Sequence, residues 1–164
     1  MEVLRHVPAF ERLSEAQLRT MKLAMSSARY DGERYIFEQG DDGDTFYLIT
    51  TGVAEVLYVD PNDPSEEEVC VALLQQSDCF GEMALLRDER RSVSIMAKGT
   101  LFVLYITRTE FEAALGQPLA MLNSAATSNY MTAVHAVVSG EAGAPAAACT
   151  VSGSPITNLE EGER

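Results

Sequence analysis

The sequence predicts a mainly β domain with flanking helices, and three observations lead to that class. Short strand-like runs fill the stretch from about Ala28 to Ile106, spaced roughly ten residues apart with hairpin-length breaks. Helical patterns occur on both sides of this stretch. The composition, 46% hydrophobic and 23% charged in 164 residues, suits one globular domain with a real core. The pattern alone indicates an antiparallel barrel or sandwich with terminal helices.

Residues 3 to 27 are predicted to be helical. Ser14 followed by Gln17 is a capping-box pattern, which marks the start of a helix. Apolar residues then recur at helical spacing, at Leu18, Met21 and Met25.

The central stretch contains six clear strand candidates. Each is rich in β-branched or aromatic residues and is bounded by Gly, Asp or Asn. They are residues 35–37, 45–50, 53–59, 68–74, 92–97 and 101–106. Gly52 is interpreted as a turn glycine that separates two of these strands.

Helical character returns in residues 107–115 and 118–138. Thr107 or Thr109 can cap the first of these helices, and Gly116 can end it. The following residues are rich in Ala, Gly, Ser and Pro and contain few large apolar side chains. We therefore expect one folded domain over residues 1–138 and a disordered tail over residues 139–164.

The charge of the chain disfavours two classes of partner. The net charge is −13, and only twelve Lys and Arg residues are present. A nucleic-acid-binding protein normally shows a basic face, and an anionic membrane surface attracts basic proteins. We therefore expect neither nucleic acid nor membrane as a partner. A small anion can still bind, because salt limits the repulsion from distant charges to about 8 Å.

The sequence favours a cytoplasmic protein without a metal site. The three cysteines are scattered and odd in number, which favours free thiols in a reducing compartment. No Cys-x-x-Cys or His-x-x-x-His spacing occurs, so a zinc site is not expected. The N-terminus lacks the apolar core of a signal peptide, and no apolar run approaches the length that spans a membrane.

The most informative motif runs from Phe80 to Leu86 and is followed by Arg91 and Ser92. Gly81 permits a sharp turn and a close approach by a ligand. The next apolar residues read as one helical turn, whose first N–H groups can bind an anion. Arg91 supplies a planar fork of donors that matches two phosphate oxygens. Glu82 is then expected to face away from the anion and to accept a hydroxyl hydrogen bond.

At these residues the sequence resembles the phosphate-binding cassette of cyclic-nucleotide-binding domains. Residues 80–92 follow the family pattern, except that Val93 stands where the family usually has Ala. A second family signature matches without a gap from Ile36 to Gly52. It reads Ile36-Phe37-x-x-Gly40-Asp41-x-Gly43-x-x-Phe46-Tyr47-Leu48-Ile49-x-x-Gly52. The resemblance covers about residues 3 to 138.

The resemblance implies an eight-stranded antiparallel jelly-roll barrel with N-terminal helices and a C-terminal helical lid. It also implies a ligand site around a 3′,5′-cyclic purine nucleotide. Arg91 and the N–H groups of Met83 and Ala84 would hold the phosphate, and Glu82 the ribose 2′-OH. Gly81 would shape this cassette, and the loop from Gly40 to Gly43 would lie near the ribose.

Two further positions bear on the base. Tyr130 resembles the tyrosine that stacks over the purine in regulatory subunits of cyclic-AMP-dependent kinases, although an aromatic that only packs the last helix is the alternative. Ser92 can bond the phosphate, the guanine amino group or the backbone. Cyclic-GMP kinases carry a guanine-reading Arg where this chain has Ala72. We therefore expect cyclic AMP to be favoured over cyclic GMP.

The resemblance implies a regulatory module without catalytic residues, whose ligand is cyclic AMP or cyclic GMP and which needs no other cofactor. Movement of the cassette and the C-terminal helix would transmit binding to a protein kinase catalytic domain on another chain or segment. The alternatives are an ion-channel gating domain and a degenerate module that binds no nucleotide, which Val93 alone favours. A transcription regulator would need a recognition helix after residue 138, and this sequence does not predict one. A barrel enzyme would need clustered His and carboxylate ligands, which the sequence also lacks.

Overall fold

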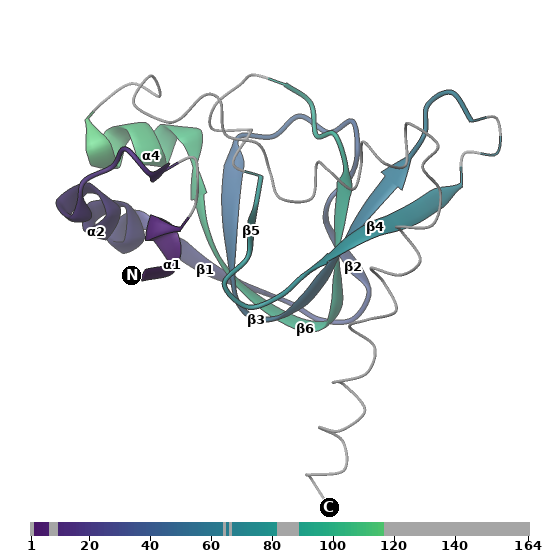
Figure 1. Cartoon of the computed structure of the whole chain (residues 1–164), viewed down its shortest axis with the longest axis horizontal. Helices are drawn as coiled ribbons and strands as arrows, with labels where there is room; N and C mark the ends of the chain where they lie inside the picture. The colour runs from purple at the N-terminus through teal and green to yellow at the C-terminus, as the bar shows by residue number, and fades with distance from the viewer. Residues whose placement is uncertain (1, 7–9, 64, 66, 82–88, 117–164) are drawn as a thin grey trace, which may run out of the picture.

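The computed structural model describes residues 2–6, 10–63, 65, 67–81 and 89–116. Within them, helices lie at one end of a curled antiparallel sheet (Figure 1). The helices are α1 (Glu2–Arg5), α2 (Glu15–Ala24) and α4 (Arg108–Leu115). The strands are β1 (Ser26–Tyr30), β2 (Arg34–Phe37), β3 (Thr45–Val59), β4 (Glu68–Leu74), β5 (Cys79–Phe80) and β6 (Ser94–Thr107).

This arrangement confirms the mainly β class with flanking helices. The count of eight strands stays a prediction, because the described residues form six. The helix over residues 118–138, the C-terminal lid and the tail over residues 139–164 lie outside the described residues.

Both longer helices begin where the sequence predicts. Ser14 caps α2: its side chain accepts from the N–H of Gln17, and the Gln17 side chain accepts from the N–H of Ser14. Thr107 forms the same reciprocal pair with Glu110 at the start of α4. Gly116 ends α4 in the left-handed region, with φ of 59°. These caps satisfy backbone groups that a helix end otherwise leaves unpaired.

The predicted extent of the first helical region is wrong at its C-terminal side. Helix α2 ends at Ala24, and Met25 already has extended backbone angles. Ser26 then begins β1, in which Ser26 pairs with Tyr105 of β6. Serine hydroxyls compete for backbone groups and weaken helices. Pairing with β6 therefore ends the helix although the apolar spacing continues through Met25.

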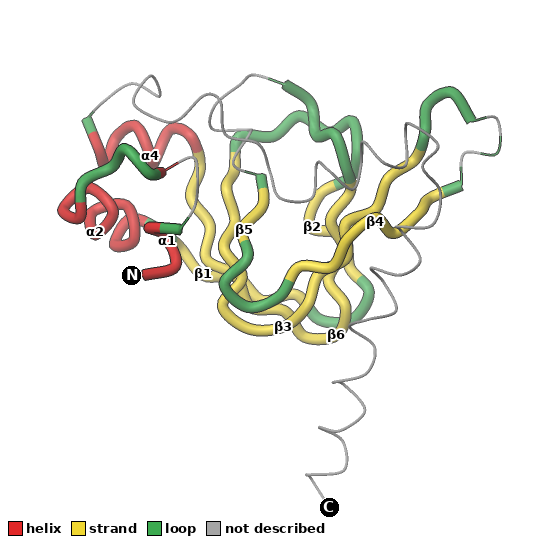
Figure 2. Tube along the Cα trace, viewed as in Figure 1, coloured by secondary structure: helices red, strands yellow, loops and turns green. Residues whose placement is uncertain are grey.

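The sheet is organised around its two long strands. Strand β6 pairs with β1, β2 and β3, and strand β3 also pairs with β4 and β5, always antiparallel. Figure 2 shows these strands curling round a common interior. Strand β5 is only two residues long, yet it places Phe80 opposite Tyr47.

Two pairs of predicted strands are single strands in the structure. Gly52 was interpreted as a turn glycine, but it lies inside β3, where the register with β6 shifts between Ile49 and Val53. Gly52 has φ of 102°, and an added Cβ would lie 2.4 Å from the carbonyl oxygen of Thr100. The glycine therefore forms a bulge that bends the strand without ending it.

The alternation of side chains along β3 divides the core into two clusters. Phe46 and Leu48 face the helices and pack with residues such as Phe10 and Phe111. Ile49 and Tyr47 face the interior of the curled sheet. Because successive strand residues point to opposite faces, one strand can anchor the helices and also line the interior.

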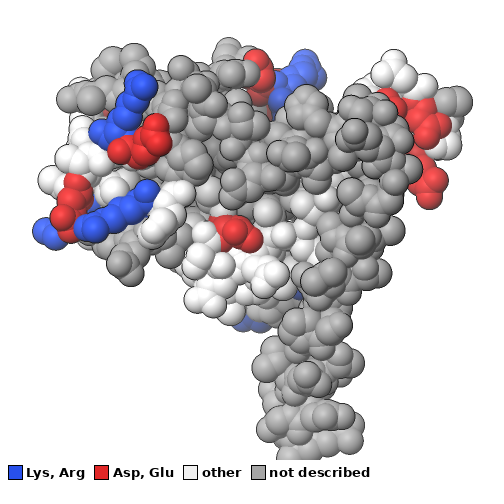
Figure 3. All heavy atoms as spheres, in the orientation of Figure 1, with Lys and Arg blue, Asp and Glu red and all other residues white. Residues whose placement is uncertain are grey.

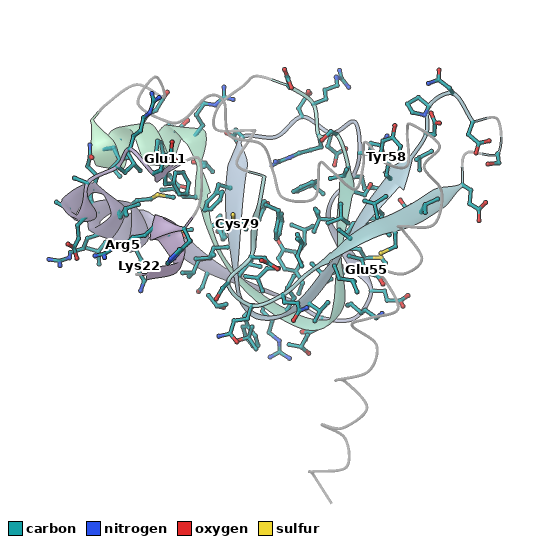
Figure 4. All side chains as sticks on the ribbon, viewed as in Figure 1. Arg5, Glu11, Lys22, Glu55, Tyr58 and Cys79 are labelled. Atoms are coloured by element: carbon teal, nitrogen blue, oxygen red, sulfur yellow. The ribbon has the colours of Figure 1, made fainter. Side chains whose placement is uncertain are left out.

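Of the two cysteines in the described ranges, one differs from the expectation. Cys79 on β5 packs against the helical cluster, between helices and sheet (Figure 4), and is not in a disulfide. Cys70 on β4 is disulfide-bonded, so the prediction of a thiol is wrong for this residue.

None of the helices in the described ranges has the length and hydrophobicity needed to cross a membrane. Acidic side chains project at the β3–β4 connection (Figure 3). The structure thus places negative charge at that end of the sheet.

Candidate functional site

The structure describes part of the predicted site. Gly81, Arg91 and Ser92 are described, and they lie at the two ends of the segment 82–88. Glu82, Met83 and Ala84 belong to that segment and lie outside the described residues, as does Tyr130. The roles assigned to these four residues therefore stay predictions.

The backbone of Arg91 is tied to the loop that joins β2 to β3. The Arg91 N–H donates to the carbonyl of Asp41, and the Gly40 N–H donates to the carbonyl of Arg91, both at 2.8 Å. The loop itself is closed by Asp41, whose side chain accepts from the N–H of Glu38 at 2.9 Å. These bonds bring together two signatures that are fifty positions apart in the sequence.

The Arg91 side chain is buried, with 9% of its surface exposed. Its Cζ lies 4.0 Å from the centroid of the Phe37 ring, so the guanidinium stands over the ring face. Its Nη2 donates to the carbonyl oxygen of Thr45 at 3.0 Å. A guanidinium has five N–H donors in a fixed plane. Its plane and position are thus determined by contacts within the protein.

Two glycines make room for this side chain. A Cβ added at Gly43 would lie 2.3 Å from Nε of Arg91, and one added at Gly81 would lie 2.9 Å from Nη1. Gly81 also has φ of 79°, which other residues rarely adopt. Gly43 was expected only to lie near the site. The structure assigns it a definite reason to be glycine, because any side chain would displace Arg91.

The Phe37 ring, which lies against the guanidinium, packs with aromatic rings from two other strands. The Tyr47 and Phe80 rings stack with centroids 4.9 Å apart and planes 11° apart. The Phe37 ring lies 5.9 Å from Phe80 and 6.1 Å from Tyr47. Burial raises the pKa of Tyr47, and the positive charge of Arg91 opposes that shift. The site therefore combines one buried cation with an aromatic wall.

Phe37 and Tyr47 belong to the signature from Ile36 to Gly52, but the sequence alone indicates no role for either. Their spacing is that of ordinary strand residues, and only the pairing of β3 with β5 places Tyr47 against Phe80. No local sequence pattern indicates that the Phe37 ring will lie under Arg91, fifty-four positions later. The signal available was the presence of both aromatics in a signature that also carries the loop glycines.

The two residues after Arg91 precede β6 and differ in burial. Ser92 is exposed, and Val93 is buried, with 1% of its surface accessible, in the interior cluster. Val93 is the one departure from the family pattern. Its methyl groups fill the apolar interior of the sheet, so the departure adds core volume beside the site.

The adjacent Arg90 has a different environment. It is largely exposed, donates to the carbonyl of Gly40 at 3.1 Å and lies 3.8 Å from a carboxylate oxygen of Asp42. An exposed pair of this kind contributes about 0–1 kcal/mol. Of the two neighbouring arginines, Arg91 is the one with the enclosed environment of a binding residue.

Comparisons with known proteins find relatives of this chain. The family description of the cyclic nucleotide-binding domain matches residues 28–117. The cGMP-dependent protein kinase egl-4 of Caenorhabditis elegans is 36% identical over 117 residues, which are 71% of this chain and 15% of that protein. The chain thus spans about one seventh of the length of that relative.

Two solved structures extend the comparison to the fold. The regulatory domain of Toxoplasma gondii PKA, crystallised with cAMP, has a TM-score of 0.61 at 25% identity, covering 73% of this chain and 45% of that one. The catabolite activator protein of Thermus thermophilus has a TM-score of 0.58 at 24% identity, covering 82% and 57%. The second likeness shows a shared fold.

The match of the family description covers more than half of the chain, and it includes the loop, the glycines and the arginine described above. The chain belongs to the cyclic nucleotide-binding domain family.

Proposed function

We propose that this domain binds a 3′,5′-cyclic purine nucleotide with the phosphate at Arg91, and that it thereby regulates a protein kinase. The observation that carries the proposal is the buried Arg91 side chain, held over Phe37 and against Thr45 between two glycines. A buried, planar cation in a chain of net charge −13 is a local exception to the field of the protein, and it suits a small anion.

The remaining contacts of the proposed ligand come from residues outside the described ranges. Under the proposal, the N–H groups of Met83 and Ala84 bind the phosphate, and Glu82 accepts from the ribose 2′-OH. Tyr130 stacks on the base. Ligand binding draws the cassette inward and lets the C-terminal helix fold over the purine, a population shift set by the differential affinity for two states.

Cyclic AMP is the favoured ligand under this proposal. Ala72 lies on β4 and packs, partly buried, against the interior cluster. An alanine there has no donor for a guanine, whereas a guanine-reading residue needs one. The exposed Ser92 hydroxyl is the feature that speaks for cyclic GMP. Both nucleotides must therefore be titrated.

The effector is proposed to be a kinase catalytic domain on another chain or segment, with this domain acting as a binding module rather than an enzyme. The relatives named above include a cGMP-dependent kinase and a regulatory domain of PKA. The net negative charge supports the absence of nucleic acid and membrane partners. We also propose a cytoplasmic location; the Cys79 thiol favours it, and the disulfide at Cys70 argues against it.

Titration calorimetry of the chain with cyclic AMP and cyclic GMP tests the ligand. Arg91→Lys keeps the charge and most of the volume but loses the bidentate fork. A hydrogen bond to a charged group contributes about 1.5–3 kcal/mol, so we expect affinity to fall about 10- to 100-fold. Arg90→Ala is the matched control, because it removes the neighbouring exposed arginine, and it should bind like the parent.

Two results contradict the proposal in different ways. Parental affinity in Arg91→Lys contradicts the assignment of the phosphate to Arg91. A parent that binds neither nucleotide supports the degenerate, non-binding module.

A further inference from the structure

We propose that Phe37 is a positioning residue of the anion site, whose ring face holds the Arg91 guanidinium in one plane. The proposal rests on the proposed function and explains how the site keeps its geometry before a ligand arrives. The first observation is the distance of 4.0 Å between Cζ of Arg91 and the centroid of the Phe37 ring.

This distance is well within the range of a cation–π interaction, which extends to about 6 Å from the ring centroid. The ring face carries negative potential, and a planar guanidinium can lie flat on it. Arg91 is 9% exposed, so water screens the attraction less than at a surface. The same pair on an exposed strand would contribute little.

Further contacts restrict the guanidinium within that plane. The Thr45 carbonyl accepts from Nη2 at 3.0 Å. The backbones of Gly43 and Gly81 approach so closely that neither position admits a Cβ beside Arg91. The ring face of Phe37 lies against the guanidinium as well. Its removal would let the plane tilt, and ligand binding would then have to order the side chain.

The ring is itself held by the fold. Phe37 ends β2, where its backbone pairs with Ile95 of β6. Its ring packs against the Tyr47 and Phe80 rings, with interplanar angles of 42° and 54°. A supporting group that is locked by its own neighbours is the requirement for a preorganised site. Phe37 meets this requirement from a position outside the phosphate-binding cassette.

The competing explanation is that Phe37 only fills the core. Stepwise fluorination of the Phe37 ring separates the two, because fluorine withdraws charge from the ring face with little change in volume. We expect the affinity for cyclic AMP and cyclic GMP to fall with each added fluorine. The total loss should be about 5- to 30-fold, the range of a partly to fully desolvated cation–π pair.

Phe111 provides the matched control. It is a fully buried aromatic that stacks on Phe10 in the helical cluster, with centroids 6.2 Å apart. The same fluorinated residues at Phe111 should leave affinity unchanged. An affinity that does not respond to fluorination at Phe37, or that responds equally at both positions, overturns the proposal.

A second measurement needs no ligand. In the nucleotide-free protein, the ring current of Phe37 should move the NMR signal of the Arg91 Nε proton upfield. Phe37→Leu should abolish this displacement, and Phe37→Tyr, which retains a ring, should restore it. An undisplaced signal in the parent overturns the positioning role even if nucleotide binds. A displaced signal in a parent that binds neither nucleotide contradicts only the proposed function.

Discussion

Gly43→Ala tests the site most directly, because the substitution acts on Arg91 through space and leaves every proposed ligand contact in the sequence. A methyl group at position 43 would lie 2.3 Å from Nε and 2.6 Å from both Cζ and Nη2 of Arg91. Ordinary contacts begin near 3.4 Å, so the guanidinium must retreat by about 1 Å. A shift of that size stretches the 3.0 Å bond to the Thr45 carbonyl beyond hydrogen-bonding distance.

The expected loss follows from the two contacts that the shift weakens. A hydrogen bond to a charged group contributes about 1.5–3 kcal/mol, and misplacing the guanidinium also misaligns it with a phosphate. We therefore expect nucleotide affinity to fall about 10- to 100-fold. Gly43 is not in the left-handed region, so alanine adds no backbone strain there. Loss of the Thr45 bond by the buried side chain should still lower the melting temperature by several degrees.

The assay is a titration with cyclic AMP and cyclic GMP beside thermal unfolding of the same samples. Gly32→Ala is the control for destabilisation alone: Gly32 has φ of 73° and no atom within 4 Å of an added Cβ. Alanine there should cost about 1–2 kcal/mol of stability through left-handed strain and leave affinity unchanged. Parental affinity in Gly43→Ala, with a folded protein, would refute the reasoning.

Three further predictions concern the sheet, a tyrosine and the lid. Gly52→Ala should destabilise the fold by more than about 2 kcal/mol in urea unfolding, since its Cβ would meet the Thr100 carbonyl at 2.4 Å and φ is 102°; an unchanged midpoint contradicts the bulge. The hydrogen bond to Glu68, with desolvation, raises the pKa of Tyr35 to about 12. Its stabilising effect should be complete below pH 10 and lost as pH rises through 12, and a phenol titration near pH 10 in the folded protein contradicts this. Tyr130→Ala should weaken nucleotide binding by about 1–3 kcal/mol, mostly through faster release; equal off-rates mean that the ring only packs.

Part of the candidate site and the helix starts follow from local sequence. Gly81 and Arg91 stand in a short pattern in which residue type and spacing carry the chemistry, and the helix caps at Ser14 and Thr107 depend only on residues three positions apart. Patterns of this kind are local, because a cap or a turn is decided by adjacent backbone groups. The roles of Glu82 and the other residues outside the described ranges stay predictions.

The same local reasoning failed where an element's end depends on a distant partner. Apolar residues recur at helical spacing through Met25, but α2 ends at Ala24 because Ser26 pairs with Tyr105 of β6. Glycine is typical of a turn, yet β3 pairs with β6 on both sides of Gly52. The strand therefore forms a bulge at Gly52 and does not end there. Strand pairing is a long-range interaction, and a single-residue signal such as glycine fits both a turn and a bulge.

What the sequence by itself determined is the class of the fold, the helix starts and the identity of the cation at the site. Only the tertiary structure decided what surrounds that cation. Phe37 lies under Arg91, and Gly43 against its Nε, because β2 pairs with β6 just after Arg91 and the following loop bonds to the backbone of Arg91 itself. Residues fifty positions apart meet only when the sheet closes, and no periodicity within either segment records which face of a ring a distant guanidinium will cover.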